Sequence, residues 1–251
     1  MRIQYCSDLH LENEENNNYI IKNPLKVTGD ILILAGDIVP LTDTYLSNPF
    51  LNFVENNFKM VFWVPGNHEF YHRDLNNFET SFHIKLKNNI NIVHNVVLQY
   101  ENIRFVFSTL WSKISSYNEK TIEQNIPDFE QILKNNKKFR AVDFNKLHDD
   151  SLNFLQKALT YNKPKTVVVT HHLPSYLSNS PSVGKSQLNE AYCVDLTDLI
   201  LQSGVNFWIH GHSHFNQKPL YIGKTILLTN QLGSIQRNEF GGFRHNAYFA
   251  I

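Results

Sequence analysis

Short, continuous apolar runs recur along the chain and are separated by polar, asparagine-rich connections. The five clearest runs lie at residues 3–5, 31–34, 60–64, 166–169 and 205–209. Continuous apolar runs of this kind are typical of strands buried on both faces, as in a sheet covered on each side. The pattern therefore predicts an α/β fold built around these strands.

The stretch from residue 111 to residue 161 has a helical pattern instead. Its apolar residues recur at three- and four-residue spacing, first over residues 122–133 and then over residues 147–159, with Pro164 beyond the second run. Such spacing places apolar side chains on one face of a helix, and proline ends helices. We therefore expect a single domain over residues 1–251 with a helical insertion at about residues 111–161.

Other segments predict loops and a hairpin. Residues 12–18 are too polar to pack and are expected to form a surface loop, whereas the apolar runs at 90–98 and 103–107 predict a β-hairpin. Residues 174–187 are rich in serine and proline and predict a loop near the functional site, a candidate lid. Residues 240–245 are either a loop that closes over the site or a turn before a last strand.

Metal-ligand residues follow each of the five apolar runs. In chain order they are Asp8 and His10, Asp37, Asn67 and His68, His171 and His172, and His210, His212 and His214. Ligands in open α/β sheets gather beyond the carboxyl ends of strands. Imidazole and carboxylate groups suit first-row divalent ions, so the set has the composition of a two-metal hydrolytic centre. Seven of the 12 histidines lie in these clusters, a concentration that core packing does not explain.

The spacing within the clusters has a geometric meaning. Asp8 and His10 are two residues apart, as are His212 and His214, and alternate side chains of an extended segment point the same way. Each pair can therefore reach one ion. Asp37 follows Gly36, whose conformational freedom allows a sharp turn, and its two carboxylate oxygens could bridge two cations.

Five short motifs resemble the signature blocks of the calcineurin-like metallophosphoesterases. In order they are Asp8-Leu9-His10, Gly36-Asp37, Gly66-Asn67-His68-Glu69, His171-His172 and Gly211-His212-Ser213-His214. All five occur in the family's order. The sequence around them is similar to bacterial members labelled cyclic-nucleotide-phosphodiesterase-like. The resemblance implies a four-layer α/β/β/α sandwich with two mixed β-sheets, and metals held between loops at one end.

The resemblance also implies how the metals are held. One ion would be bound by Asp8, His10, Asp37 and His214, and the other by Asp37, Asn67, His171 and His212. Ions about 3.5–4 Å apart lower the pKa of a bridging water, and metal-bound hydroxide then attacks phosphorus in line. Asp37 would bridge the ions, and His68 would face the substrate and assist the leaving oxygen. Two divalent ions, of Mn, Fe, Zn, Ni or Co, suit this ligand set.

Candidates for substrate binding are Asn67, Arg73, His172 and His210. Adjacent strand-end side chains diverge, so only one of His171 and His172 can easily point at an ion, and the family pattern favours His171. His172 and His210 either orient ligands or touch substrate, with plain structural packing as the alternative. Arg73 could pair with a phosphate oxygen, or it is a solvated loop arginine.

The composition limits which cellular compartments and which binding partners we expect for this protein. Lys and Arg total 23, as do Asp and Glu, so no global field attracts nucleic acid or an anionic membrane. No apolar run approaches about 18 residues, the length that suggests a membrane span. Cys6 and Cys193 form neither a metal pair nor a disulfide framework, and we expect no signal peptide before the first strand. We expect a cytoplasmic protein acting on a small-molecule phosphoester, without a membrane partner.

Three functions compete at this point. The favoured one is a dinuclear metal-dependent phosphoesterase that hydrolyses a small phosphodiester or phosphomonoester. A nuclease on DNA or RNA would need a basic groove and salt-dependent affinity, and the zero net charge weighs against it. A non-catalytic metal-binding scaffold would be expected to lose ligands or the substrate-facing histidine, whereas this chain keeps both.

Overall fold

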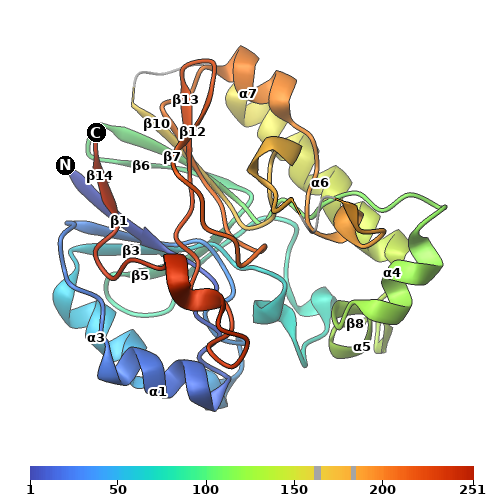
Figure 1. The fold of residues 1–251 in the computed structure, drawn as a ribbon, viewed down its shortest axis with the longest axis horizontal. Coiled ribbons are helices and arrows are strands. Elements are labelled where there is room, and N and C mark those ends of the chain that lie inside the picture. The colour runs from blue at the N-terminus through green and yellow to red at the C-terminus, as the bar shows by residue number, and fades with distance from the viewer. Residues whose placement is uncertain (161–164, 182–184) are drawn as a thin grey trace.

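Two six-stranded mixed sheets form the centre of the molecule (Figure 1). The computed structural model describes residues 1–160, 165–181 and 185–251. The first sheet has the spatial order β14 (Tyr248–Ala250), β1 (Arg2–Cys6), β2 (Ile31–Leu34), β3 (Met60–Trp63), β5 (Ile90–His94) and β4 (Phe82–Lys85). The second has the order β12 (Leu220–Ile222), β13 (Thr225–Leu228), β11 (Phe207–Ile209), β10 (Thr166–Thr170), β7 (Ile103–Ser108) and β6 (Val96–Tyr100). The five apolar runs all fall on strands, as predicted.

The inner strands of each sheet are parallel, and the edge strands β14, β4, β12 and β6 are antiparallel to their neighbours. Parallel neighbours end at the same edge of a sheet. The segments that follow β1, β2 and β3, and those that follow β10 and β11, are therefore brought to the same end of the molecule. This arrangement positions the candidate site.

Successive residues of a strand pack on opposite faces and so define the layers. In β2, Ile31 and Ile33 belong to the cluster between the sheets, whereas Leu32 and Leu34 face the helices α1 (Glu14–Lys22) and α3 (Pro49–Asn57). The outer face of the second sheet is covered by α6 (Ala141–Leu159) and α7 (Thr197–Ser203) (Figure 1). The expected four-layer α/β/β/α sandwich is confirmed.

The predicted hairpin is correct only in its second part. Strands β6 and β7 pair as expected, but the apolar run at 90–98 divides between the two sheets, with β5 in the first and β6 in the second. The break is at Asn95, which has a left-handed backbone (φ 50°). Its side chain donates to Thr80 O at 2.8 Å and accepts from Ser108 Oγ at 2.7 Å, and these contacts hold the crossover.

The expected surface loop at residues 12–18 is wrong beyond its first two residues, because α1 begins at Glu14. Its polar residues cover the solvent face, while Ile20 packs inward. Asn16 is buried, and its amide donates to Leu9 O at 2.9 Å and to Gly233 O at 2.8 Å. The polar composition of this segment is that of a surface helix, and the buried side-chain amide of Asn16 links the loops that contain Leu9 and Gly233.

The region between β7 and β10 is helical but interrupted. It contains α4 (Glu119–Asn125), α5 (Asp128–Gln131), a small hairpin of β8 (Leu133–Lys134) and β9 (Lys137–Lys138), and then α6. Pro127 separates α4 from α5, and the hairpin turns at Asn135 and Asn136, both with left-handed backbones. Asparagine tolerates this conformation well. The helical run predicted over residues 122–133 therefore ends with α5 at Gln131, and the hairpin begins at Leu133.

Two expectations fall partly outside the described residues. Pro164 lies outside them, as do residues 182–184 of the candidate lid. The described part of that segment begins with a 3-10 helix, η3 (Tyr176–Ser178). Within the described chain, no helix is long and apolar enough to cross a membrane.

Candidate metal centre

The seven predicted metal ligands converge where the parallel strands of both sheets end. Asp8 and His10 follow β1, Asp37 follows β2 and Asn67 follows β3. His171 follows β10, and His212 and His214 follow β11. Four residues from three segments of the first half of the chain and three residues from two segments of the second half thus share one site, as the strand-end pattern predicts.

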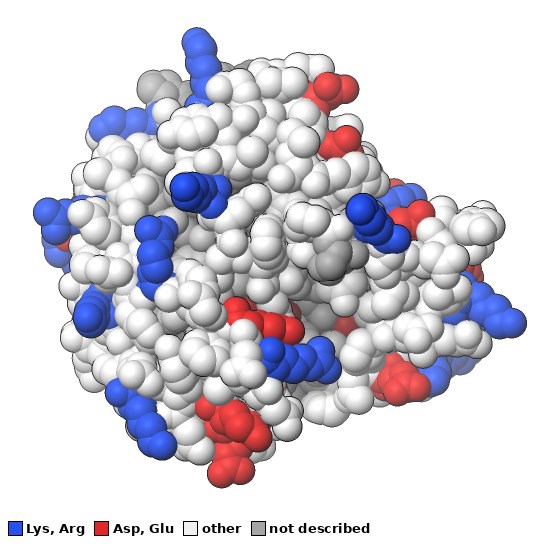
Figure 2. All heavy atoms as spheres, viewed as in Figure 1, with Lys and Arg blue, Asp and Glu red and all other residues white. Residues whose placement is uncertain are grey.

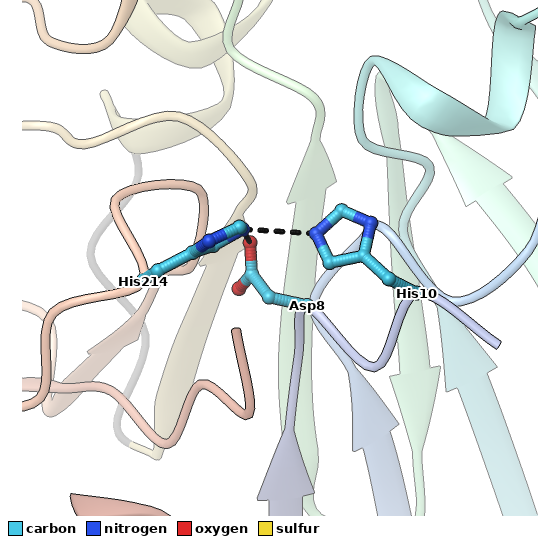
Figure 3. Close-up of side chains that lie close together, drawn as sticks. All are labelled: Asp8, His10 and His214. Atoms are coloured by element: carbon cyan, nitrogen blue, oxygen red, sulfur yellow. Dashed lines mark hydrogen bonds and ion pairs between the residues drawn. The ribbon is translucent and has the colours of Figure 1, made fainter. Parts of the chain in front are cut away.

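One group of ligand atoms comes from Asp8, His10 and His214, whose side chains point toward one another in Figure 3. His10 Nε2 and His214 Nε2 are 2.9 Å apart, and His214 Nε2 is 3.6 Å from Asp8 Oδ1. Ligand atoms at about 2.0–2.2 Å from one ion are separated by about 3.0–3.5 Å from each other. The group therefore has the spacing of ligands around one divalent ion.

A second group comes from Asp37, His171 and His212, with the amide of Asn67 beside it. His171 Nε2 lies 3.3 Å from Asp37 Oδ2, 3.1 Å from His212 Nδ1 and 3.2 Å from Asn67 Oδ1. These separations also match those of ligands around one ion. The ligand atoms of Asp37, His171 and His212 all lie within 4.8 Å of one another.

Asp37 connects the two groups. Its Oδ2 is 3.8 Å from His10 Nε2 in the first group and 3.3 Å from His171 Nε2 in the second. Burial opposes ionisation of Asp37, but the imidazoles of His171, His68 and His10 outweigh it and hold the pKa of the carboxyl well below its usual range. The carboxylate is therefore ionised, as a bridging ligand must be.

Each of the four candidate imidazole ligands has its second ring nitrogen occupied by an acceptor. His171 Nδ1 donates to Ala35 O at 2.8 Å, and His212 Nε2 donates to Ala191 O at 3.2 Å. His10 Nδ1 and His214 Nδ1 instead donate to the carboxylates of Glu12 and Glu239, at 3.2 and 2.6 Å. Such partners fix the tautomer, so the other nitrogen of each ring is free to bind a metal.

The loops that carry the ligands are backbone-strained. Asp8, His10, Asp37, His212 and His214 all have φ between 45° and 76°. Residues other than glycine adopt this region at a cost of order 1–3 kcal/mol each, and such strain concentrates at functional sites. The left-handed turns direct side chains from strand ends into one small volume.

Two glycines leave room for the converging side chains. A Cβ built on Gly66 would lie 2.2 Å from Asp37 Oδ1 and 2.6 Å from His171 Nε2. Gly36, with φ at 92°, would place its Cβ 2.2 Å from His171 Nδ1. Only residues without a side chain fit here, so the backbone itself forms part of the cradle around Asp37 and His171. The donor chemistry, the spacing and this cradle all fit divalent metal ions.

Glu69 holds the cradle together and is not directed at the ligand atoms. Its fully buried carboxylate accepts from the backbone nitrogens of Asp37 (2.8 Å), Ile38 (2.7 Å) and Gly66 (2.6 Å), and from Trp63 Nε1 (2.9 Å). Burial and the Asp37 carboxylate raise the pKa of Glu69 to about 7, while these donors favour its ionised form. Glu69 therefore supports the loops that carry Asp37 and Gly66.

His68 lies at the mouth of the site. Its Nδ1 donates to Glu12 Oε1 at 2.9 Å, its Nε2 is 4.0 Å from Asp37 Oδ2, and its ring stacks on Tyr71 at 4.1 Å. Burial alone would lower the pKa of His68, but the carboxylates of Asp37 and Glu12 raise it to about 9. The side chain is 25% exposed and lines the cleft over the ligand atoms.

Three other predicted site residues occupy different positions. His172 is fully buried and packs its ring 4.1 Å from that of His212 and against Trp111. His210 is buried within the second sheet's end. Arg73 lies over the ring of Phe78 at 5.5 Å. None of the three is among the described residues that line the cleft over the centre, so the structure does not bring them to the predicted substrate position.

Sequence reasoning missed three carboxylates that support the ligands. Glu12 and Glu239 hold His10 and His214, and Asp128 Oδ1 accepts from Asn67 Nδ2 at 2.8 Å and from Tyr71 OH at 2.8 Å. Only Glu12 had a signal, because it continues the alternate spacing of Asp8 and His10. Asp128 and Glu239 come from distant segments and have no local signature.

A cleft of about 480 Å³ opens over the ligand atoms. Its floor includes His10, Asp37, Asn67, His212 and His214. Figure 2 shows that this face is hollowed, with acidic and basic side chains scattered over it and no continuous basic surface. The volume lies within the range of sites for small molecules.

Comparison with known proteins agrees with this geometry. Residues 1–216 match the sequence model of the calcineurin-like phosphoesterases. A protein of Acanthamoeba polyphaga mimivirus, named uncharacterized protein L509, is 33% identical over 279 residues that cover 98% of this chain and 96% of that protein. The crystal structure of phosphopantetheinyl hydrolase (PptH) from Mycobacterium tuberculosis has the same fold, with a TM-score of 0.73, 15% identity, and coverage of 98% of this chain and 95% of that one.

Proposed function

The chain belongs to the calcineurin-like phosphoesterase family and is a metal-dependent phosphoric ester hydrolase, and we propose that it hydrolyses a small phosphoester with two divalent ions held around Asp37. The observation that carries this proposal is the position of Asp37 between two groups of ligand atoms, 3.8 Å from His10 Nε2 and 3.3 Å from His171 Nε2. One carboxylate placed in this way can serve both groups. A single-ion site would need only one of them.

The residues divide into two ligand sets. One set comprises Asp8, His10, Asp37 and His214, and the other Asp37, Asn67, His171 and His212. When bound, divalent ions supply Lewis acidity and lower the pKa of water. Imidazole and oxygen ligands suit Mn, Fe, Zn, Ni and Co, and we take Mn²⁺ as the first to test.

His68 is the residue of this chain that acts on the leaving group. His68 lines the cleft, while Glu12 holds its Nδ1 and sustains the protonated form. A protonated imidazole at this position can donate a hydrogen bond or a proton to the oxygen that leaves phosphorus. Because Glu12 also holds His10, one carboxylate aligns a metal ligand with the proton donor.

The cleft favours a small substrate over a nucleic acid. Within its described lining, Arg237 is the only Lys or Arg. A nuclease needs several cations along a groove to neutralise successive phosphates. The two buried, unpaired cysteines fit a reducing compartment such as the cytoplasm.

The decisive experiment measures hydrolysis of an aryl phosphodiester and of the matching monoester by protein stripped of metal and reloaded with Mn²⁺. We expect turnover of at least one ester only in the reloaded protein, with close to two ions bound by elemental analysis. Full metal occupancy without turnover of either ester would instead favour a metal-binding scaffold.

A further inference from the structure

The cleft over the metal ligands has two chemically different walls. Three lining residues, Ile126, Leu188 and Tyr192, belong to one apolar cluster, and the ring of Tyr192 places this apolar wall beside His212. The wall beside His214 is polar and is formed by the segment 234–237. A substrate that fills the cleft therefore meets unlike surfaces on the two sides of its phosphorus.

The apolar wall is attached directly to the second group of ligands. The ring of Tyr192 lies 4.9 Å from that of His212, and the adjacent Ala191 carbonyl accepts from His212 Nε2. Ile126 comes from the segment between α4 and α5, next to Asp128, which holds Asn67. Aromatic and aliphatic surface at this place favours an apolar or aromatic group of the substrate.

The polar wall is attached equally directly to the first group. Glu239 Oε2 accepts from His214 Nδ1 at 2.6 Å and from the Ser234 backbone nitrogen at 2.7 Å. Ser234 Oγ in turn accepts from the Arg237 backbone nitrogen at 3.2 Å. The turn that carries Arg237 is therefore linked through the Glu239 carboxylate to the candidate metal ligand His214.

The guanidinium of Arg237 is available for a ligand. Arg237 is exposed, and among the described residues it forms no salt bridge, although the Glu239 carboxylate lies close enough to feel its charge. Arg237 is also the only Lys or Arg in the described lining. An arginine presents a planar fork of donors that matches carboxylate and phosphate groups.

We propose that Arg237 selects a phosphodiester whose two arms differ, one apolar or aromatic against Tyr192 and the other ending in an anionic group beside Arg237. The inference rests on the proposed phosphoesterase function and specifies its substrate. A phosphomonoester has a single arm and would leave one wall of the cleft without a contact. In the reaction, water forms the new bond to phosphorus, the ester bond to the departing arm breaks, and the proton of water is released to that arm or to solvent.

The test uses three diesters that share a 4-nitrophenyl leaving group. Their second arms are ethyl, 2-carboxyethyl and 2-(trimethylammonio)ethyl, which are neutral, anionic and cationic. Because wild type and Arg237→Gln are assayed on the same three compounds, differences in the intrinsic reactivity of the compounds cancel from the comparison. We expect Arg237→Gln to lower the ratio of kcat/KM for the carboxyethyl over the ethyl diester by about fivefold, mainly through KM, as one charge pair of limited burial would give. Arg237→Lys should restore part of the ratio.

The control is Arg2→Gln, which removes an exposed arginine at the start of β1, at the opposite end of that strand from Asp8. It should leave the ratio unchanged. The inference is overturned if Arg237→Gln leaves the ratio at the wild-type value, or if 4-nitrophenyl phosphate is a better substrate than every diester. Absence of hydrolysis of all four esters by metal-loaded protein would overturn the proposed function itself, which is a separate and recognisable result.

Discussion

The two groups of ligand atoms are held in different ways. In the group that contains His171 and His212, both imidazoles donate to backbone carbonyls, those of Ala35 and Ala191. In the group that contains His10 and His214, both imidazoles donate to side-chain carboxylates, those of Glu12 and Glu239. A carbonyl that is fixed by the fold cannot be removed by a side-chain substitution, whereas a carboxylate can.

Exposure does not separate the two groups. Each has two buried members, Asp8 and His10 in one and Asp37 and His171 in the other, and one half-buried histidine at the cleft, His214 or His212. The difference between the groups therefore lies in what holds their imidazoles and not in their burial. We expect substitutions to separate the two groups, except at the residue that they share.

The largest effect is expected from Asp37→Asn, which breaks both groups at once. The amide keeps the shape of the carboxylate but loses its charge, so neither group retains its anionic bridge. We expect loss of both ions on dialysis and a fall in kcat/KM of more than about 10³-fold. Elemental analysis and phosphoesterase assays measure the two quantities. The control Asp149→Asn, at an exposed carboxylate paired with Lys113, should keep both ions. Retention of both ions by Asp37→Asn would show that it does not connect the groups.

The second prediction distinguishes a loss of turnover from a loss of bound metal. His68→Ala should keep both ions and lower kcat by about 10²–10⁴-fold, the usual contribution of a positioned acid. His83→Ala, at an exposed histidine of β4, is the matched control. If His68→Ala instead loses metal to the same extent as Asp37→Asn, the roles that distinguish these residues are wrong.

The sequence predicted the strands and the candidate ligands because both have local signatures. A buried parallel strand requires a continuous apolar run, and the candidate ligands follow such runs. The alternate spacing of His212 and His214 was read as that of an extended segment, but both residues adopt left-handed turns, which are what bring their side chains to the site. A residue at which the chain crosses between the sheets, or one that holds a ligand in place, has no such local signature. Asn95, which moves the chain from one sheet to the other, looks like one polar residue within an apolar run.

The supporting carboxylates show the same limit for the site. Glu12 lies two residues after His10 and was within reach of the spacing argument, but its polar surroundings suggested a loop. Glu239 is 25 residues from His214, and Asp128 is 61 residues from Asn67. Only the packing of the insertion and of the chain's last segment brings these carboxylates to the ligands.

The third prediction tests the side-chain support of the His214 group. Glu239→Gln removes the charge that holds His214 Nδ1, and losing such a partner typically weakens metal binding by about 10–100-fold. We expect one of two ions to weaken by this amount in a calorimetric metal titration, while the other keeps its affinity. Glu190→Gln, near the cleft but bonded to Ser115, is the control. Equal weakening of both ions would contradict the division into two groups.

The smallest effect is expected at Asp128, whose carboxylate holds the Asn67 amide of the His171 group. Asp128→Asn keeps a carbonyl oxygen that can accept from Asn67 and Tyr71, so the affinity of the corresponding ion should fall by less than about tenfold. Asp128→Ala removes the acceptor, leaves the buried Asn67 amide without that partner, and should weaken the same ion further. Glu130→Gln, at an exposed carboxylate of the same helix α5, is the control. If neither substitution at Asp128 changes metal affinity, the backbone carbonyls alone fix the His171 group, and the insertion contributes only the wall of the cleft.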